Sequence, residues 1–216
     1  EQTFIRASTN GGLNAASFYA LSNSKDPLQP PLEYEADQMV DGLFARGSLG
    51  YKDTYYLEAT MRRDRSSTLP KADNTYFYPS ISTSVLLSNI IKKDWISFAK
   101  FRANYAQVGS ATDPYDVFNT YVISTPFNGQ GIASLNSTLN NLELKSETSK
   151  SFEVGLEASF LDNRLNLDFS YYRTRTEDQI TPVPVSNATG YTRKLLNAGE
   201  IENKGIEVLL GATPLE

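Results

Sequence analysis

The sequence predicts an all-β protein built as an antiparallel up-and-down meander, and three observations support this. Apolar and polar residues alternate with a period of two over several segments, as they do in half-buried strands. The connections between these segments alternate between short turns and long polar stretches. Tyrosine and phenylalanine, which favour strands, supply 13 and 11 of the 216 residues.

The composition argues against most kinds of active site. The chain has no cysteine and no histidine, which removes thiol chemistry, the usual general base and the commonest metal ligands. Its 20 Lys and Arg against 25 Asp and Glu give a net charge of −5, unlike a nucleic-acid-binding surface. No apolar run approaches the roughly 20 residues of a membrane-spanning helix. We therefore expect no enzyme activity, no cofactor, no metal site and no nucleic-acid partner.

The predicted strands follow one another along the chain. Weak alternation predicts strands at 3–7 and 15–22. Clear alternation over 43–51 and 55–62 predicts a hairpin that turns at Lys52-Asp53. The strongest alternation, over 151–161, reverses at Asp162-Asn163-Arg164 into 165–172. Further strands, for a total of about ten, are predicted at 80–87, 99–106, 191–197 and 205–212.

The connections predict two different rims. Short turns are expected near 10–12, 52–53, 162–163 and 199–204, the last because Asn203 and Gly205 tolerate positive φ. Long loops are expected at 23–40, 64–76, 107–147 and 175–190, and residues 88–95, on the short side, are expected to hold one helical turn. Short turns on one rim and long loops on the other are typical of an outer-membrane barrel.

The alternation also predicts two faces. Charged residues on the polar faces are expected to line the lumen: Arg46, Glu58, Arg62, Arg102, Glu153, Glu157 and Asp168. Apolar residues of the long hairpin are expected to face lipid: Phe152, Val154, Leu156, Phe160, Leu165, Leu167, Phe169 and Tyr171. Tyrosines near strand ends suit an aromatic girdle: Tyr51, Tyr55, Tyr105 and Tyr171. A Lys or Arg facing lipid at the midplane would cost about 2–4 kcal/mol, which supports this division.

Other interpretations of the same residues are weaker. Glu153 and Glu157 would lie about 13 Å apart along one strand face, too far for a glycosidase carboxylate pair. Asp113 and Asp116 match no EF-hand spacing and are expected to be ordinary loop residues. The alternative fold is a soluble β-sandwich carbohydrate-binding module, which also alternates and would bind sugar on exposed Tyr and Trp. Strands of about 9–11 residues favour the barrel.

Six short motifs then connect the chain to a known family. They are Tyr-Tyr-Leu-Glu-Ala-Thr-Met-Arg-Arg-Asp-Arg-Ser-Ser at 55–67, Tyr-Pro-Ser-Ile-Ser at 78–82, Lys-Phe-Arg-Ala-Asn-Tyr at 100–105, Leu-Glu-Leu-Lys-Ser-Glu-Thr at 142–148, Thr-Gly-Tyr at 189–191 and Asn-Ala-Gly-Glu-Ile-Glu-Asn-Lys-Gly-Ile-Glu at 197–207. Through these motifs, residues 40–214 resemble the barrel of SusC/RagA-type TonB-linked outer-membrane transporters (TonB-dependent receptors) of Bacteroidetes. Arg65 stands where the family usually has Gly, and this difference affects the expected conformation of a loop but not the expected fold.

The resemblance implies a fragment of a much larger protein. Residues 1–214 would be part of a plugged transmembrane barrel of about 22 strands, without the plug, the TonB-contacting segment or the final strands. Leu215-Glu216 resembles a cloning scar. The implied location is the Gram-negative outer membrane, and the implied activity is TonB-driven import of glycan or peptide fragments. The implied partners are a SusD-like surface lipoprotein, TonB through regions absent here, and outer-membrane lipid.

Overall fold

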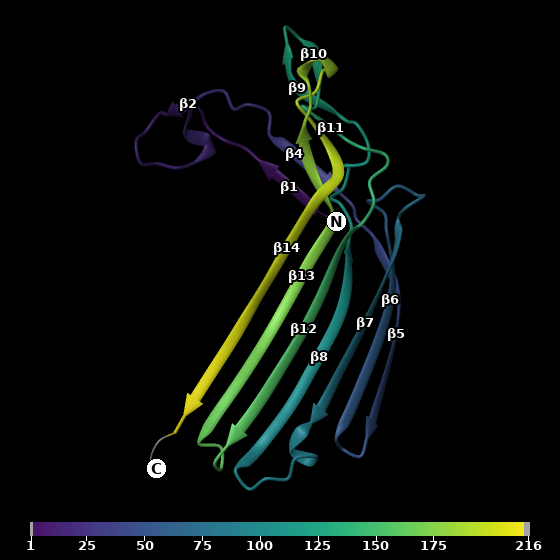
Figure 1. The fold of residues 1–216 in the computed structure, drawn as a ribbon. Helices are drawn as coiled ribbons and strands as arrows, with labels where there is room; N and C mark the ends of the chain where they lie inside the picture. Colours follow the sequence, from purple (N-terminus) through teal and green to yellow (C-terminus); the bar gives the residue numbers. More distant parts are fainter. Residues whose placement is uncertain (1, 214–216) are drawn as a thin grey trace.

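One antiparallel sheet dominates the computed structural model, which describes residues 2–213 (Figure 1). Its strand order is β11-β14-β13-β12-β8-β7-β6-β5, so successive long strands are also neighbours in space. The seven long strands are β5 Val40–Tyr51, β6 Tyr55–Ser66, β7 Thr75–Leu86, β8 Ile96–Ser110, β12 Glu147–Phe160, β13 Leu165–Pro184 and β14 Arg193–Ala212. The short β11, Thr138–Leu139, pairs in parallel with β14. The predicted meander is therefore confirmed.

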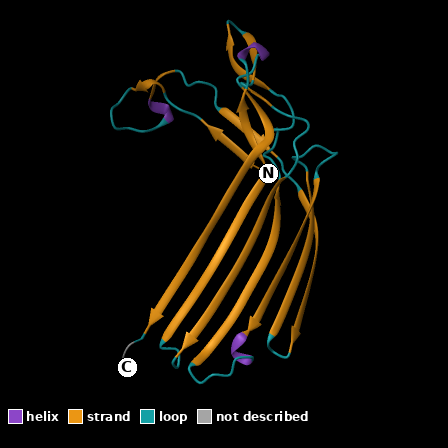
Figure 2. Cartoon of the chain, viewed as in Figure 1, coloured by secondary structure: helices purple, strands orange, loops and turns teal. Residues whose placement is uncertain are grey.

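The short and long connections lie at opposite ends of the sheet (Figure 2). Residues 52–54, 87–95 and 161–164 make the connections at one end. Asp53 and Asn163 adopt positive φ there, as the turn residues were expected to. The 3₁₀ helix η2, Leu87–Asn89, confirms the helical turn predicted within 88–95.

The opposite end carries all the remaining elements, and we call it the long-loop rim (Figure 1). β1 Gln2–Arg6 pairs with β4 Leu32–Ala36, and β2 Asn10–Leu13 pairs with β3 Ser24–Asp26. β9 Tyr121–Phe127 pairs with β10 Gln130–Leu135. The 3₁₀ helices η1, Leu21–Asn23, and η3, Asn187–Thr189, also lie at this end.

The predicted reversal at 199–204 is wrong, because β14 runs without interruption from Arg193 to Ala212. Gly205 has no positive φ and instead lies opposite Tyr172 of β13. A Cβ atom on Gly205 would meet the Tyr172 hydroxyl oxygen at 2.7 Å. The glycine therefore makes room for a neighbouring ring and does not turn the chain.

Three other expectations at the long-loop rim also need correction. The strand predicted at 15–22 is wrong: this segment is a loop closed by Asn23, whose side chain hydrogen-bonds Ala15 and Phe18. Residues 10–12, expected as a turn, belong to β2. The loop predicted at 175–190 is mostly strand, because β13 continues to Pro184. The meander therefore has seven long strands rather than about ten passes.

The sheet is a single layer. Most contacts of each long strand are with its neighbours in the sheet. The buried apolar side chains are few: Ala36, Leu69, Ala99, Val117, Leu144 and Ala158. Within residues 2–213, no helix is long and apolar enough to cross a membrane. The residues expected to be a cloning scar, 215–216, lie outside the described residues.

Candidate functional site

The strand register places all seven predicted lumen residues on one face of the sheet, here called the polar face. Glu58 is aligned with Ser82, Ser82 with Asn104, and Asn104 with Glu153. Arg46 and Arg62 share this face by the same alternation, as do Arg102, Glu157 and Asp168. Residues far apart in the sequence therefore form one continuous polar surface.

Arg102 connects three strands on the polar face. Its guanidinium on β8 lies 3.5 Å from a Glu153 carboxylate oxygen on β12 and 3.0 Å from Asp168 Oδ1 on β13. Gly155, directly opposite Arg102, makes this reach possible, since a Cβ there would meet Arg102 Nε at 2.5 Å. The three charged side chains are about one-third exposed, which suits a wet surface.

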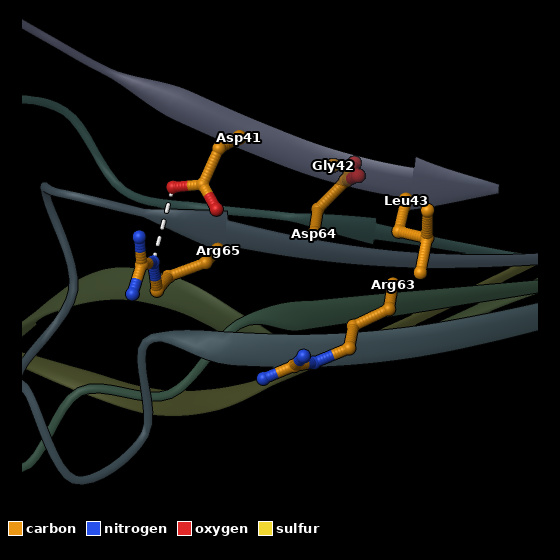
Figure 3. A pocket seen from close by; sticks show the side chains of 6 residues that line it. All are labelled: Asp41, Gly42, Leu43, Arg63, Asp64 and Arg65. Atoms are coloured by element: carbon orange, nitrogen blue, oxygen red, sulfur yellow. Dashed lines mark hydrogen bonds and ion pairs between the residues drawn. The ribbon is translucent and has the colours of Figure 1, made fainter.

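A second polar cluster surrounds Asp64 near the long-loop rim. Asp64 as a whole is only 5% exposed, and its carboxylate accepts hydrogen bonds from Arg62 Nε at 2.8 Å and from the Tyr78 hydroxyl. Figure 3 shows the Asp64 side chain reaching toward Gly42 on β5, where a Cβ atom would collide with it. Tyr76 stacks on Tyr78 with ring centroids 6.0 Å apart.

Two more ion pairs complete the polar face. Arg46 Nη2 lies 2.6 Å from Glu58 Oε2, and Lys100 Nζ lies 3.9 Å from Glu157 Oε2. Sequence reasoning missed Asp64 and Lys100 as members of this face. Both could have been found by extending the alternation by two residues, from Arg62 and Arg102.

The predicted lipid-facing residues lie together on the opposite face, here called the apolar face. Leu156 is aligned with Phe169, Val154 with Tyr171, and Phe160 with Leu165. Large apolar side chains remain exposed here on several strands, with Phe152 43%, Leu165 45% and Leu210 74% exposed. A single-layer sheet with such a face needs a covering of apolar material.

Aromatic side chains lie at both ends of the apolar face. Tyr51 and Tyr55 flank the β5–β6 turn with ring centroids 6.3 Å apart, and Trp95 stacks on Phe160 at 5.6 Å. Tyr105 and Tyr171 lie farther along their strands, where the apolar residues end. The positions of these tyrosines fit an aromatic girdle at each membrane interface.

Beyond Tyr105 and Tyr171, toward the long-loop rim, the same face of the sheet carries charged residues that sequence reasoning did not identify. Arg173 pairs with Glu202 at 2.5 Å, Arg175 with Glu200 at 2.8 Å, and Lys150 with Glu177 at 2.5 Å. On the edge strands, Arg65 pairs with Asp41 at 3.0 Å (Figure 3). The apolar face therefore ends in a charged band toward the long-loop rim.

The long-loop rim contains a hollow of about 590 Å³ lined by segments far apart in the sequence. Tyr34 of β4 and Tyr115 lie edge to face at 6.2 Å, and the Tyr115 hydroxyl donates to the Glu35 carbonyl at 2.7 Å. Asn140 donates to the carbonyl oxygens of Tyr115 and Phe118. Aromatic and amide groups of this kind can bind sugars or peptides.

None of the described residues forms a cluster of three or more carboxylates that could hold a metal ion. Asp116, expected from its spacing to be an ordinary loop residue, accepts a hydrogen bond from Thr112 Oγ1 at 2.6 Å. Glu153 and Glu157 form ion pairs with different cations, Arg102 and Lys100. The candidate site therefore consists of the polar face, the apolar face and the long-loop rim.

Known proteins share this arrangement. Residues 4–213 match the family described as TonB dependent receptor-like, beta-barrel. The chain is 32% identical to TonB-dependent receptor P3 of Formosa agariphila over 90% of this chain and 20% of that one. It is 24% identical to TonB-dependent receptor SusC of Bacteroides thetaiotaomicron over 87% of this chain and 20% of that one. The structure of the RagAB peptide transporter superposes with a TM-score of 0.80 at 22% identity, over 95% of this chain and 23% of that one.

The chain spans about one-fifth of the length of the curated relatives it matches. The superposition supports the same fold, and the family match extends over nearly every described residue. This chain belongs to the family of TonB-dependent receptor-like β-barrels.

Proposed function

We propose that this chain is a wall segment of the barrel of an outer-membrane TonB-dependent transporter. The observation that carries the proposal is the division of seven strands into one charged face and one apolar face within a single layer. In a transmembrane barrel, the polar face lines a wet lumen and the apolar face contacts lipid. The chain then contributes to transport and does no bond chemistry.

The proposed roles follow from this orientation. The seven charged residues Arg46, Glu58, Arg62, Arg102, Glu153, Glu157 and Asp168 face the lumen. The eight apolar residues Phe152, Val154, Leu156, Phe160, Leu165, Leu167, Phe169 and Tyr171 face lipid. Placing the ion pairs of Arg102 toward lipid would carry a large desolvation cost, which supports the first assignment.

The proposed partners and substrate come from the relatives. One similar structure is titled as a peptide transporter, which supports import of peptide fragments. Glycan fragments are included because the six motifs resemble those of SusC/RagA-type transporters, and one relative is named SusC. We expect a SusD-like surface lipoprotein to contact the long-loop rim, where the Tyr34–Tyr115 hollow offers recognition groups. TonB would act through parts of the receptor outside this chain.

Spin labels in the full-length receptor test the orientation with matched neighbours. Leu167 and Asp168 are adjacent in β13 but belong to opposite faces, and Val154 and Glu153 form a second such pair. In lipid nanodiscs, labels at Leu167 and Val154 should be quenched by oxygen, and labels at Asp168 and Glu153 by a water-soluble nickel chelate. The reverse pattern would contradict the proposed function.

A soluble carbohydrate-binding sandwich is not favoured. Such a module would cover its apolar face with a second sheet, whereas the apolar face here includes Leu43, Leu49 and Leu210, all more than 70% exposed. The full-length receptor should accordingly need detergent or lipid to remain dispersed. A receptor that stays monomeric in plain buffer would favour the sandwich.

A further inference from the structure

The charged band at the end of the apolar face follows a regular line across the sheet. On β14 the last apolar residue of this face is Ile206, and the strand register aligns it, through the intervening strands, with Leu49 of β5. On β5, however, the last apolar residue is Leu43, six residues nearer the long-loop rim. On average, the boundary therefore shifts by one residue per strand over the six strand steps from β14 to β5.

This slope defines a plane. With about 3.3 Å per residue and about 4.8 Å between strands, one residue per strand corresponds to an angle of roughly 35°. Strands of transmembrane barrels tilt by about 35–45°. With the strands tilted by this angle, the boundary runs parallel to the membrane plane. The whole charged band then lies at one depth, at the membrane–water interface on the side of the long loops.

The band carries an excess of positive charge. On β12–β14 the cations Lys150, Arg173, Arg175 and Lys204 face the carboxylates Glu177, Glu200 and Glu202, which leaves one positive charge. On β5 and β6, Asp41 pairs with Arg65 while Arg63 shares the same face opposite Leu43, which leaves one more positive charge. These cations lie at the level where lipid headgroups are found.

A hollow of about 290 Å³ lies within the band, next to the apolar residues. Its lining includes three cations, one carboxylate and two aromatic rings: Lys150, Arg173, Arg175, Glu177, Tyr105 and Phe152. Arg175 Nε is buried and makes no hydrogen bond, although Glu177 Oε1 lies 3.3 Å away. Guanidinium groups in this setting suit a phosphate, which accepts several hydrogen bonds at once.

We infer that this hollow binds a phosphate group of an outer-leaflet glycolipid. The phosphate contacts Arg173, Arg175 and Lys150, and the acyl chains lie along the apolar face below Phe152. The lipid is thereby held against β12–β14 at a set depth. This inference rests on the proposed function, because it needs the apolar face to contact lipid.

Binding of lipid A to the full-length receptor in detergent tests the inference by native mass spectrometry. The probes are lipid A with both phosphates and the same lipid enzymatically dephosphorylated. We expect the receptor to bind the phosphorylated lipid about tenfold more tightly, and R173Q/R175Q to lose about that factor. The matched control R46Q/K100Q removes the same charge from the polar face and should bind like the original receptor.

The outcomes separate the inference from the proposed function. Equal binding of the two lipids, or equal loss in R46Q/K100Q, would overturn the phosphate site while the nanodisc labels still report lipid at Leu167. Labels at Leu167 exposed to water would overturn both. The heat-dependent shift of folded barrels on electrophoresis shows whether R173Q/R175Q is folded. Arg173→Lys keeps the positive charge that attracts the phosphate and should therefore retain most of the lipid A binding.

Discussion

At the scale of single residues, two glycines allow long side chains to cross neighbouring strands. Gly155 leaves space for Arg102 to reach Asp168, and Gly205 leaves space for the ring of Tyr172. A glycine within a strand weakens it by itself, because it has no side chain to pack. The partner side chain that fills the space offsets this loss.

Replacing Gly155 with alanine should therefore separate Arg102 from Asp168. The new Cβ would lie 2.5 Å from Arg102 Nε, so the guanidinium must move away from its carboxylate partners. We expect a loss of about 1 kcal/mol in the free energy of unfolding of the full-length receptor, measured by urea titration in detergent. Gly47→Ala is the matched control, because a Cβ at Gly47 meets nothing within 4 Å. An equal effect of the two substitutions would contradict this account of Gly155.

At the scale of elements, β13 and β14 extend well beyond the length needed to cross a membrane. Both contain 20 residues, whereas a tilted crossing takes about 9–11. Their pairing is irregular between Thr176 and Gln179, where Asp178 adopts a positive φ. At this irregularity the Asn197 side chain replaces a missing strand–strand hydrogen bond, because its Nδ2 donates to the Asp178 carbonyl at 2.8 Å.

Asn197→Ala should loosen the outer halves of these two strands. The Asn197 side chain also makes two hydrogen bonds to the Lys145 backbone, both 2.9 Å long, so three bonds are lost. We expect a local cost of about 1–3 kcal/mol. Amide hydrogen exchange of the full-length receptor should become faster around 140–146 and 178–184 and stay unchanged at 165–171. Asn203→Ala is the control, because the Asn203 side chain makes no hydrogen bond within residues 2–213. Faster exchange throughout the barrel would contradict a local role for Asn197.

At the scale of the whole molecule, the sheet is one wall without a second layer. Every residue of the edge strand β5 is exposed, and its outer backbone groups have no partner strand among the described residues. The apolar face is exposed to solvent at the same time. Open edges and uncovered apolar faces both favour association.

The isolated 216-residue chain should therefore self-associate in buffer without detergent. Edge strands of two copies can pair, which satisfies their open backbone groups, and their apolar faces can pack together, which removes them from water. Light scattering coupled to size exclusion should report dimers or larger species that detergent disperses. A detergent-free monomer with a cooperative unfolding transition would show that the chain is a self-contained domain.

Strand positions and faces could be predicted because the alternation of side chains is a local property of each strand. The alternation predicts the hairpins 43–51/55–62 and 151–161/165–172 and seven of the charged residues of the polar face, but not Asp64 and Lys100. Gly205 was misinterpreted for an equally physical reason. A glycine favours both a turn and a close approach, and only the position of Tyr172 on another strand distinguishes the two.

The sequence by itself therefore determined the class of fold, the two faces and the two rims, because each depends on residues a few positions apart. The tertiary structure alone decided what depends on register between strands. Arg102 contacts Asp168 across 66 positions of sequence, and the charged band forms a level line only when seven strands are aligned. Register is set by the sum of many weak pairings along whole strands, and no short segment contains that information.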